Sequence, residues 1–133
     1  MKALLSNIFI LLTVVAVHGQ AKSEGVTYGM TKSCYDAVVG LDVAKMSEHF
    51  GSSIEIITSA GGGIYSRKQA EQVLLSYFDV LKNEKCVLLQ DKKSAGARLA
   101  IGEIRADGKK IRLYVLTQQQ NNKSVIQQIR LEE

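Results

Sequence analysis

The clearest signal for the fold is the stretch SRKQAEQVLLSYFDVL, residues 66–81, which predicts a long amphipathic helix. Ser66 and Gln69 have the spacing of a capping box, in which each side chain satisfies a backbone group at the start of the helix. Apolar side chains then recur with helical spacing at Ala70, Val73, Leu74, Tyr77, Phe78 and Leu81. A stripe of this width must cover a broad apolar surface.

Strand patterns on both sides of this helix supply that surface. Four stretches after the helix are rich in apolar residues, and turn signals at Asp107-Gly108 and Asn121-Asn122 separate the last three. They are residues 86–90, 98–105, 110–117 and 124–131. Before the helix, the sequence predicts short helices at residues 31–39 and 43–50 and a strand at residues 52–58. Clustered elements of this kind indicate an α+β fold, with the helices packed on one face of a curved antiparallel sheet.

Alternation along the last three strands divides the sheet into two faces. We expect the face under the helices to carry Leu99, Ile101, Ile111, Leu113, Val115, Val125, Ile129 and Leu131. The opposite face is unusually apolar for a solvated surface, and its interface candidates are Arg112, Tyr114, Leu116, Ile126 and Arg130. Tyr and Arg are enriched at protein interfaces, so a homodimer through this face is one expectation. A solvated face with scattered apolar residues is the alternative.

The first residues predict a secretory signal peptide over residues 1–21. Lys2 precedes an apolar run that ends at Val17, and cleavage is expected after Gly19 or Ala21. The apolar run is short for a spanning helix, although an uncleaved anchor is the alternative. We therefore expect residues 22–133 to form a single exported domain, periplasmic or extracellular, without stable membrane insertion after cleavage.

Composition and charge exclude several classes of protein. The chain has 133 residues, which is too short for a doubly wound dinucleotide enzyme or a (β/α)₈ barrel. Its 17 Lys and Arg residues against 13 Asp and Glu residues are scattered, without the aromatic set of an RNA-binding sheet, so no nucleic-acid partner is expected. Cys34 and Cys86 have no metal-ligand spacing. Export permits a disulfide between them, and two buried thiols are the alternative.

Five segments together resemble the nuclear-transport-factor-2-like superfamily, a cone of curved antiparallel sheet wrapped by helices. They are KMSEHFGSSIEI (45–56), GIYSRKQAEQVL (63–74), AIGEI (100–104), RLYVL (112–116) and IQQIRLE (126–132). More specifically, the chain resembles a family of secreted Bacteroidetes domains known only as a domain of unknown function. The resemblance implies the cone fold and an exported location. It implies no activity, and it transfers no catalytic residues.

Few residues are candidates for chemistry. The glycines at 61–63 lack a phosphate-loop motif and are interpreted as a tight connection. His49 is interpreted as a structural residue at a helix C-terminus. Glu103 is the one weak candidate for acid–base catalysis, since alternation places it inward with Leu99 and Ile101. The candidates for a ligand pocket inside the cone are Glu103, Gln127, Tyr77 and Phe78.

These observations predict a non-enzymatic exported domain that binds a partner protein or a small ligand, with no cofactor and no metal. The alternative is an enzyme that acts on a small hydrophobic molecule in the cone cavity.

Overall fold

The structure is a computed structural model that describes residues 26–27, 29–81, 84–94 and 96–133. The predicted leader lies outside these residues. The elements follow the order β1 (Val26–Thr27), β2 (Met30–Thr31), α2 (Lys32–Val39), α3 (Val43–Ser47), β3 (Phe50–Thr58), β4 (Gly61–Ser66), α4 (Arg67–Phe78), the 3₁₀ turn η1 (Asp79–Leu81), β5 (Cys86–Ser94), β6 (Ala97–Ala106), β7 (Lys109–Gln120) and β8 (Lys123–Glu132).

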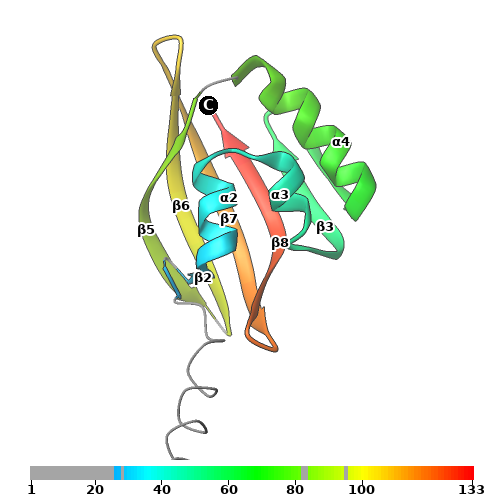
Figure 1. Cartoon of the computed structure of the whole chain (residues 1–133). Helices are drawn as coiled ribbons and strands as arrows, with labels where there is room; N and C mark the ends of the chain where they lie inside the picture. Colours follow the sequence, from blue (N-terminus) through cyan, green and yellow to red (C-terminus); the bar gives the residue numbers. More distant parts are fainter. Residues whose placement is uncertain (1–25, 28, 82–83, 95) are drawn as a thin grey trace, which may run out of the picture.

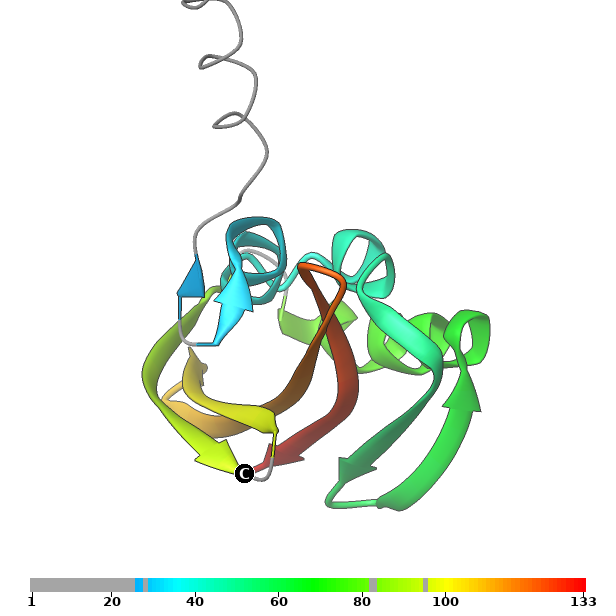
Figure 2. The ribbon, with the colours of Figure 1, turned by 90° about the horizontal axis from the view of Figure 1, so that it is seen from below.

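The main sheet has the strand order β4-β3-β8-β7-β6-β5. Strands β5 to β8 form the predicted antiparallel meander, whose turns at Asp107-Gly108 and Asn121-Asn122 have positive φ angles, as two-residue hairpin turns require. Strand β3 joins the meander by parallel pairing with β8 and pairs antiparallel with β4. The helices lie together on one side of the sheet, which curves around them (Figures 1 and 2). The predicted α+β cone is therefore confirmed.

The long helix forms as its sequence predicts. Ser66 Oγ accepts a hydrogen bond from the Gln69 backbone N–H at 3.3 Å, and Gln69 Oε1 accepts one from the Ser66 backbone N–H at 3.1 Å. The predicted stripe faces the core. Ala70, Leu74, Phe78 and Leu81 are buried, and Val73 and Tyr77 pack against them.

Strand β6 turns toward the core the side chains predicted to lie on the outer face. Residues directly opposite in neighbouring strands share a face, and Ile104 and Gly102 lie opposite Ile111 and Leu113 of the core. Leu99 and Ile101 therefore point away from the helices, and their prediction as inner residues is wrong. The inner position at Gly102 has no side chain because Cys86 and Leu88 of β5 lie against it.

A bulge in β8 overturns two further predictions. Leu116 pairs with Gln128 and Thr117 pairs with Ile126, so Gln127 is an extra residue between them. The bulge reverses the alternation, which buries Ile126 completely in the core and leaves Val125 half-buried on the other face. Ile126 is therefore no interface residue, and Val125 is no core residue.

Two shorter segments also differ from expectation. The glycine run predicted as a connection is the beginning of edge strand β4. The second short helix ends at Ser47, and Phe50 already belongs to β3. Cys34 on α2 and Cys86 on β5 are both buried thiols.

Candidate functional site: the outer face of the sheet

The outer face of the sheet, which points away from the helices, carries neighbouring apolar side chains from three strands. In β6 and β7, Ile101 lies opposite Tyr114 and Leu99 lies opposite Leu116. On the edge strand β5, Val87 and Leu89 are 62% and 49% exposed. We call these residues the outer apolar patch: Val87, Leu89, Leu99, Ile101, Tyr114 and Leu116. Val87 and Leu89 are its most exposed members, whereas Leu99, Tyr114 and Leu116 are half-buried and Ile101 is only 5% exposed. Exposed apolar area that gathers on one face marks interaction sites more often than scattered residues do.

Charged side chains of both signs border this patch on β7 and β8. Arg130 lies opposite Tyr114, and its guanidinium carbon is 5.7 Å from the centre of the Tyr114 ring, in cation–π geometry. Glu132 forms an ion pair with Arg130 and accepts a hydrogen bond from the Tyr114 hydroxyl at 3.4 Å. Of the five predicted interface residues, the structure brings together Arg112, Tyr114, Leu116 and Arg130.

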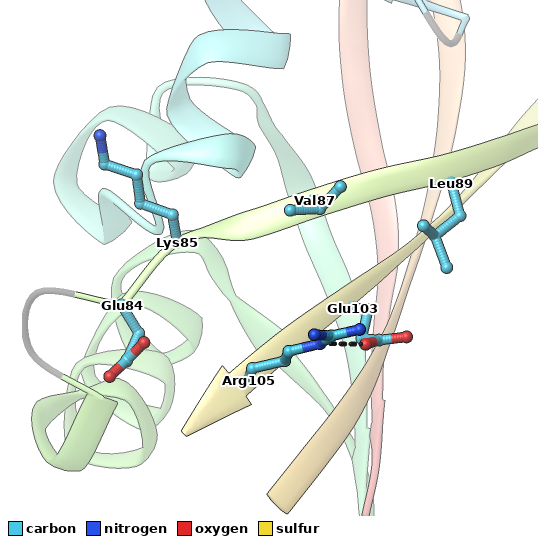
Figure 3. Close-up of a pocket in the computed structure, with 6 residues that line it drawn as sticks. All are labelled: Glu84, Lys85, Val87, Leu89, Glu103 and Arg105. Carbon is cyan, nitrogen blue, oxygen red and sulfur yellow. Dashed lines mark hydrogen bonds and ion pairs between the residues drawn. The ribbon is translucent and has the colours of Figure 1, made fainter. Parts of the chain in front are cut away.

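A pocket of about 440 Å³ opens on the outer face at β5 and β6, and we call it the outer pocket. It is lined by Glu84, Lys85, Val87, Leu89, Glu103 and Arg105. Figure 3 shows Val87 and Leu89 on one strand, with Glu103 and Arg105 beside each other on the next. The outer pocket thus combines exposed apolar side chains with charged ones.

Glu103 lies in this outer pocket and not inside the cone, so its prediction as an inward residue is wrong. Its Oε1 accepts a hydrogen bond from Arg105 Nε at 2.8 Å, and its side chain is only 13% exposed. That hydrogen bond lowers the pKa of the Glu103 carboxyl; burial opposes the shift, and the nearby positive charge of Lys110 adds to it. A general acid in an apolar cavity needs the opposite shift. The geometry suits a carboxylate that is ion-paired with Arg105.

The other predicted pocket residues lie at separate places. Gln127 is the bulge residue of β8, and its Nε2 donates to Gln118 Oε1 at 2.6 Å. Tyr77 lines a pocket of about 270 Å³ beside the β6–β7 turn, where burial, and then the charge of Glu133, raise the pKa of its hydroxyl. Phe78 is buried in the core, where its ring meets that of Tyr77 edge to face. The structure does not bring these residues together with Glu103.

The interior of the cone is occupied by side chains. Leu113, Val115 and Ile129 are completely buried and form one cluster with Phe78. Among the described residues, no group of three His, Cys, Asp or Glu side chains could hold a metal ion. Across the same parts of the chain, no helix is long and apolar enough to cross a membrane.

Sequence reasoning missed the contribution of β5 to the outer face. The run Val87-Leu88-Leu89 is apolar at consecutive positions, which places apolar side chains on both faces of a strand. Such a run in an edge strand is a sequence signal for apolar side chains on the outer face. A polar pocket of about 530 Å³ near the beginning of β8 has no sequence signal, because its residues are widely separated in the sequence.

Comparison of the sequence with known proteins identifies a matching family. The family model described as a domain of unknown function, DUF4783, matches residues 34–132. No curated protein matches the sequence.

Solved structures share the fold at low sequence identity. A DUF4783 family protein from Bacteroides fragilis superposes with a TM-score of 0.69 at 16% identity, over 78% of this chain and 98% of that chain. One from Bacteroides ovatus gives 0.68 at 13% identity, over 80% and 97%. An NTF2-like protein of unknown function from Cytophaga hutchinsonii gives 0.56 at 12% identity, over 84% and 92%. At these identities the similarity concerns the fold alone.

Proposed function

The chain belongs to the DUF4783 family, and we propose that it is an exported, non-enzymatic binding domain that associates with a second copy of itself through its outer sheet face. The observation that carries this proposal is the outer apolar patch beside charged residues of both signs. Removing this patch from water on association would be favourable, at roughly 25 cal/mol per Å² of apolar area.

The charges of this face favour a second copy over a partner of one charge sign. Arg112 and Arg130 lie on the same face as Glu103 and Glu132. In a two-fold symmetric contact, the same surface meets itself, so arginines of one copy can approach glutamates of the other. A strongly acidic or basic partner would instead leave one set of charges against like charges.

The enzyme alternative has less support. Its one candidate acid, Glu103, lies on the outer face in an ion pair with Arg105. The inner side of the sheet beneath the helices is filled by core side chains such as Leu113 and Phe78. Export is part of the proposal because of the predicted leader.

The test is the molar mass of the protein in solution with two matched variants. Val87→Asp adds a charge to the outer apolar patch, whereas Val80→Asp adds the same charge on η1, where Val80 is 80% exposed and lies beside the β6–β7 turn, outside that patch. We expect light scattering after gel filtration to give a dimer mass for the wild type and for Val80→Asp, and a monomer mass for Val87→Asp. A wild type that stays monomeric up to about 1 mM would refute association, since functional dimers usually bind more tightly.

A further inference from the structure

A second pocket uses none of the residues of the outer apolar patch. This polar pocket has a volume of about 530 Å³ and lies between the start of α2, the start of β3, the first residue of α4 and the β7–β8 turn. Four of the lining residues have acidic or basic side chains: Glu48, His49, Arg67 and Lys123. Thr31, Ser33 and Asn122 add polar groups to its lining. Pockets of this size hold small ligands in other proteins.

Arg67 is held in place at the edge of the polar pocket. Its Nη2 donates a hydrogen bond to the Phe50 carbonyl at 3.0 Å, which joins the beginning of α4 to the beginning of β3. A guanidinium has five N–H donors in a planar fork, so one such bond leaves donors that can bind a carboxylate in bidentate geometry. Because this hydrogen bond already orders the Arg67 side chain, ligand binding costs less side-chain conformational entropy.

Other parts of the lining are also held in place by hydrogen bonds. Ser124 Oγ accepts hydrogen bonds from the Thr31 backbone N–H at 2.8 Å and from Gln119 Nε2 at 2.9 Å, and both Ser124 and Thr31 are buried. Ile126 N–H donates to the His49 carbonyl at 2.7 Å, which ties the segment that carries Glu48 and His49 to β8. The polar pocket is therefore built between elements that the backbone holds together.

The charges select the class of ligand. Arg67 and Lys123 are cations and Glu48 is an anion, so these three side chains together carry one net positive charge. A single carboxylate matches this charge, whereas a doubly charged phosphate would exceed it. The polar lining from Thr31, Ser33 and Asn122 suits hydroxyl groups rather than an apolar body. We propose that the polar pocket binds a small polyhydroxylated carboxylate of the sugar-acid class, with its carboxylate between Arg67 and Lys123.

The experiment is a titration of the isotope-labelled full protein with glucuronate, followed by NMR chemical shifts, with glucose and inorganic phosphate at equal ionic strength as comparisons. We expect glucuronate to shift signals of residues that line the polar pocket, with saturation by about 10 mM. Glucose, which lacks the charge, should cause no saturable shift, and phosphate should bind more weakly than glucuronate. No saturable shift with glucuronate, or tighter binding of phosphate, would overturn the assignment.

Three variants locate the site. Arg67→Gln should weaken glucuronate binding about tenfold or more, because it removes a charge-assisted hydrogen-bond donor. Lys68→Gln is the matched control, since Lys68 is the next residue of α4, is exposed and does not line the polar pocket. It should leave the affinity unchanged. Glu48→Gln removes the opposing charge and should tighten binding, a gain that a folding defect cannot produce. Equal losses in Arg67→Gln and Lys68→Gln, or weaker binding in Glu48→Gln, would refute the site.

The oligomeric state is measured on the same samples, so the two proposals fail independently. Val87→Asp should still bind glucuronate with wild-type affinity, because Val87 does not line the polar pocket.

Discussion

The Sγ of Cys86 lies directly over Gly102, so close that a Cβ on residue 102 would be 2.5 Å from it. The Leu88 side chain would be 2.8 Å from the same Cβ. This contact joins β5 to β6 on the inner face of the sheet, and it explains why the core position of β6 at this point has no side chain.

Gly102→Ala should therefore destabilise the protein by about 1–3 kcal/mol, the usual cost of overpacking a core. Cys86→Ala removes the sulfur and should recover part of that loss, so the double variant should be more stable than the sum of the single changes predicts. Urea unfolding followed by circular dichroism measures the cycle. Gly62→Ala is the control, since a Cβ there meets only ordinary contacts and the residue is exposed. Strict additivity of the two core substitutions would contradict the contact.

The Cys86 thiol makes stability depend on alkaline pH. Burial raises its pKa from 9.0 to about 11, partly opposed by a backbone hydrogen bond from Glu103. The unfolded chain loses this proton above pH 9, whereas the folded chain retains it until about pH 11. Stability contributed by Cys86 is therefore lost as the pH rises through this interval, by about 3 kcal/mol in total.

The measurement is the free energy of unfolding at pH 8 and pH 10.5, with Cys86→Ala as the control. The variant should lose less stability than the wild type over this range. Iodoacetamide at pH 8 should also label Cys86 only as fast as the protein unfolds, because the thiolate is the reactive form. Rapid labelling of Cys86 in the native protein would disprove the burial argument.

The ion pair between Asp91 and Arg98 should contribute more to stability than an exposed pair. It lies on the inner side of the β5–β6 ladder, where the side chains of Arg98 and Asp91 are 37% and 27% exposed, and the Nε of Arg98 is buried without a hydrogen-bond partner. Asp91→Asn leaves the guanidinium uncompensated and should cost about 1–2 kcal/mol in thermal or urea unfolding. Asp36→Asn breaks the exposed pair with Lys32 and should change stability by less than about 0.5 kcal/mol. Equal effects of the two substitutions would contradict the prediction.

The proposed export, with removal of the leader, predicts a defined N-terminus. When the full chain is expressed in a Gram-negative host, we expect the protein in the periplasmic fraction to begin at Gln20 or Lys22, after removal of residues 1–19 or 1–21. Intact-mass spectrometry of that fraction gives the cleavage site. A full-length product that stays with the membrane fraction would instead favour the uncleaved anchor.

The helix at residues 66–81 could be predicted in detail because its signals are local. The capping box and the apolar spacing act within a few residues, and the structure has both. The hairpin turns at Asp107-Gly108 and Asn121-Asn122 are local in the same way. The order of helices and strands could be predicted from such local signals together with the resemblance to a superfamily of cone-shaped folds.

The faces of the strands could not be predicted as well, because they depend on neighbours. Alternation in β6 favours Leu99 and Ile101 as core residues, but the core position is Gly102, which a hydrophobicity pattern does not mark. In β8, Gln127 reverses the alternation without any local sign in the sequence. Glu103 lies on the same face of β6 as Ile101. The candidate site that includes Glu103 is therefore on the outer face of the sheet and not inside the cone. The residues that line the polar pocket, such as Phe50, Arg67 and Lys123, are far apart in the sequence, so no local pattern marks them.

The position of β8 between β3 and β7 has a consequence for how the protein is made. Gln128 of β8 donates a hydrogen bond to Glu55 of β3, which is 73 positions earlier in the sequence. Because β3 pairs with the meander through β8, the β3–β4 hairpin cannot join the sheet until β8 has been synthesised. Contacts between distant residues slow folding, because a long loop must close before they form. A nascent chain of this topology stays open during most of its synthesis, the state in which an unfolded polypeptide can be threaded through a translocation channel.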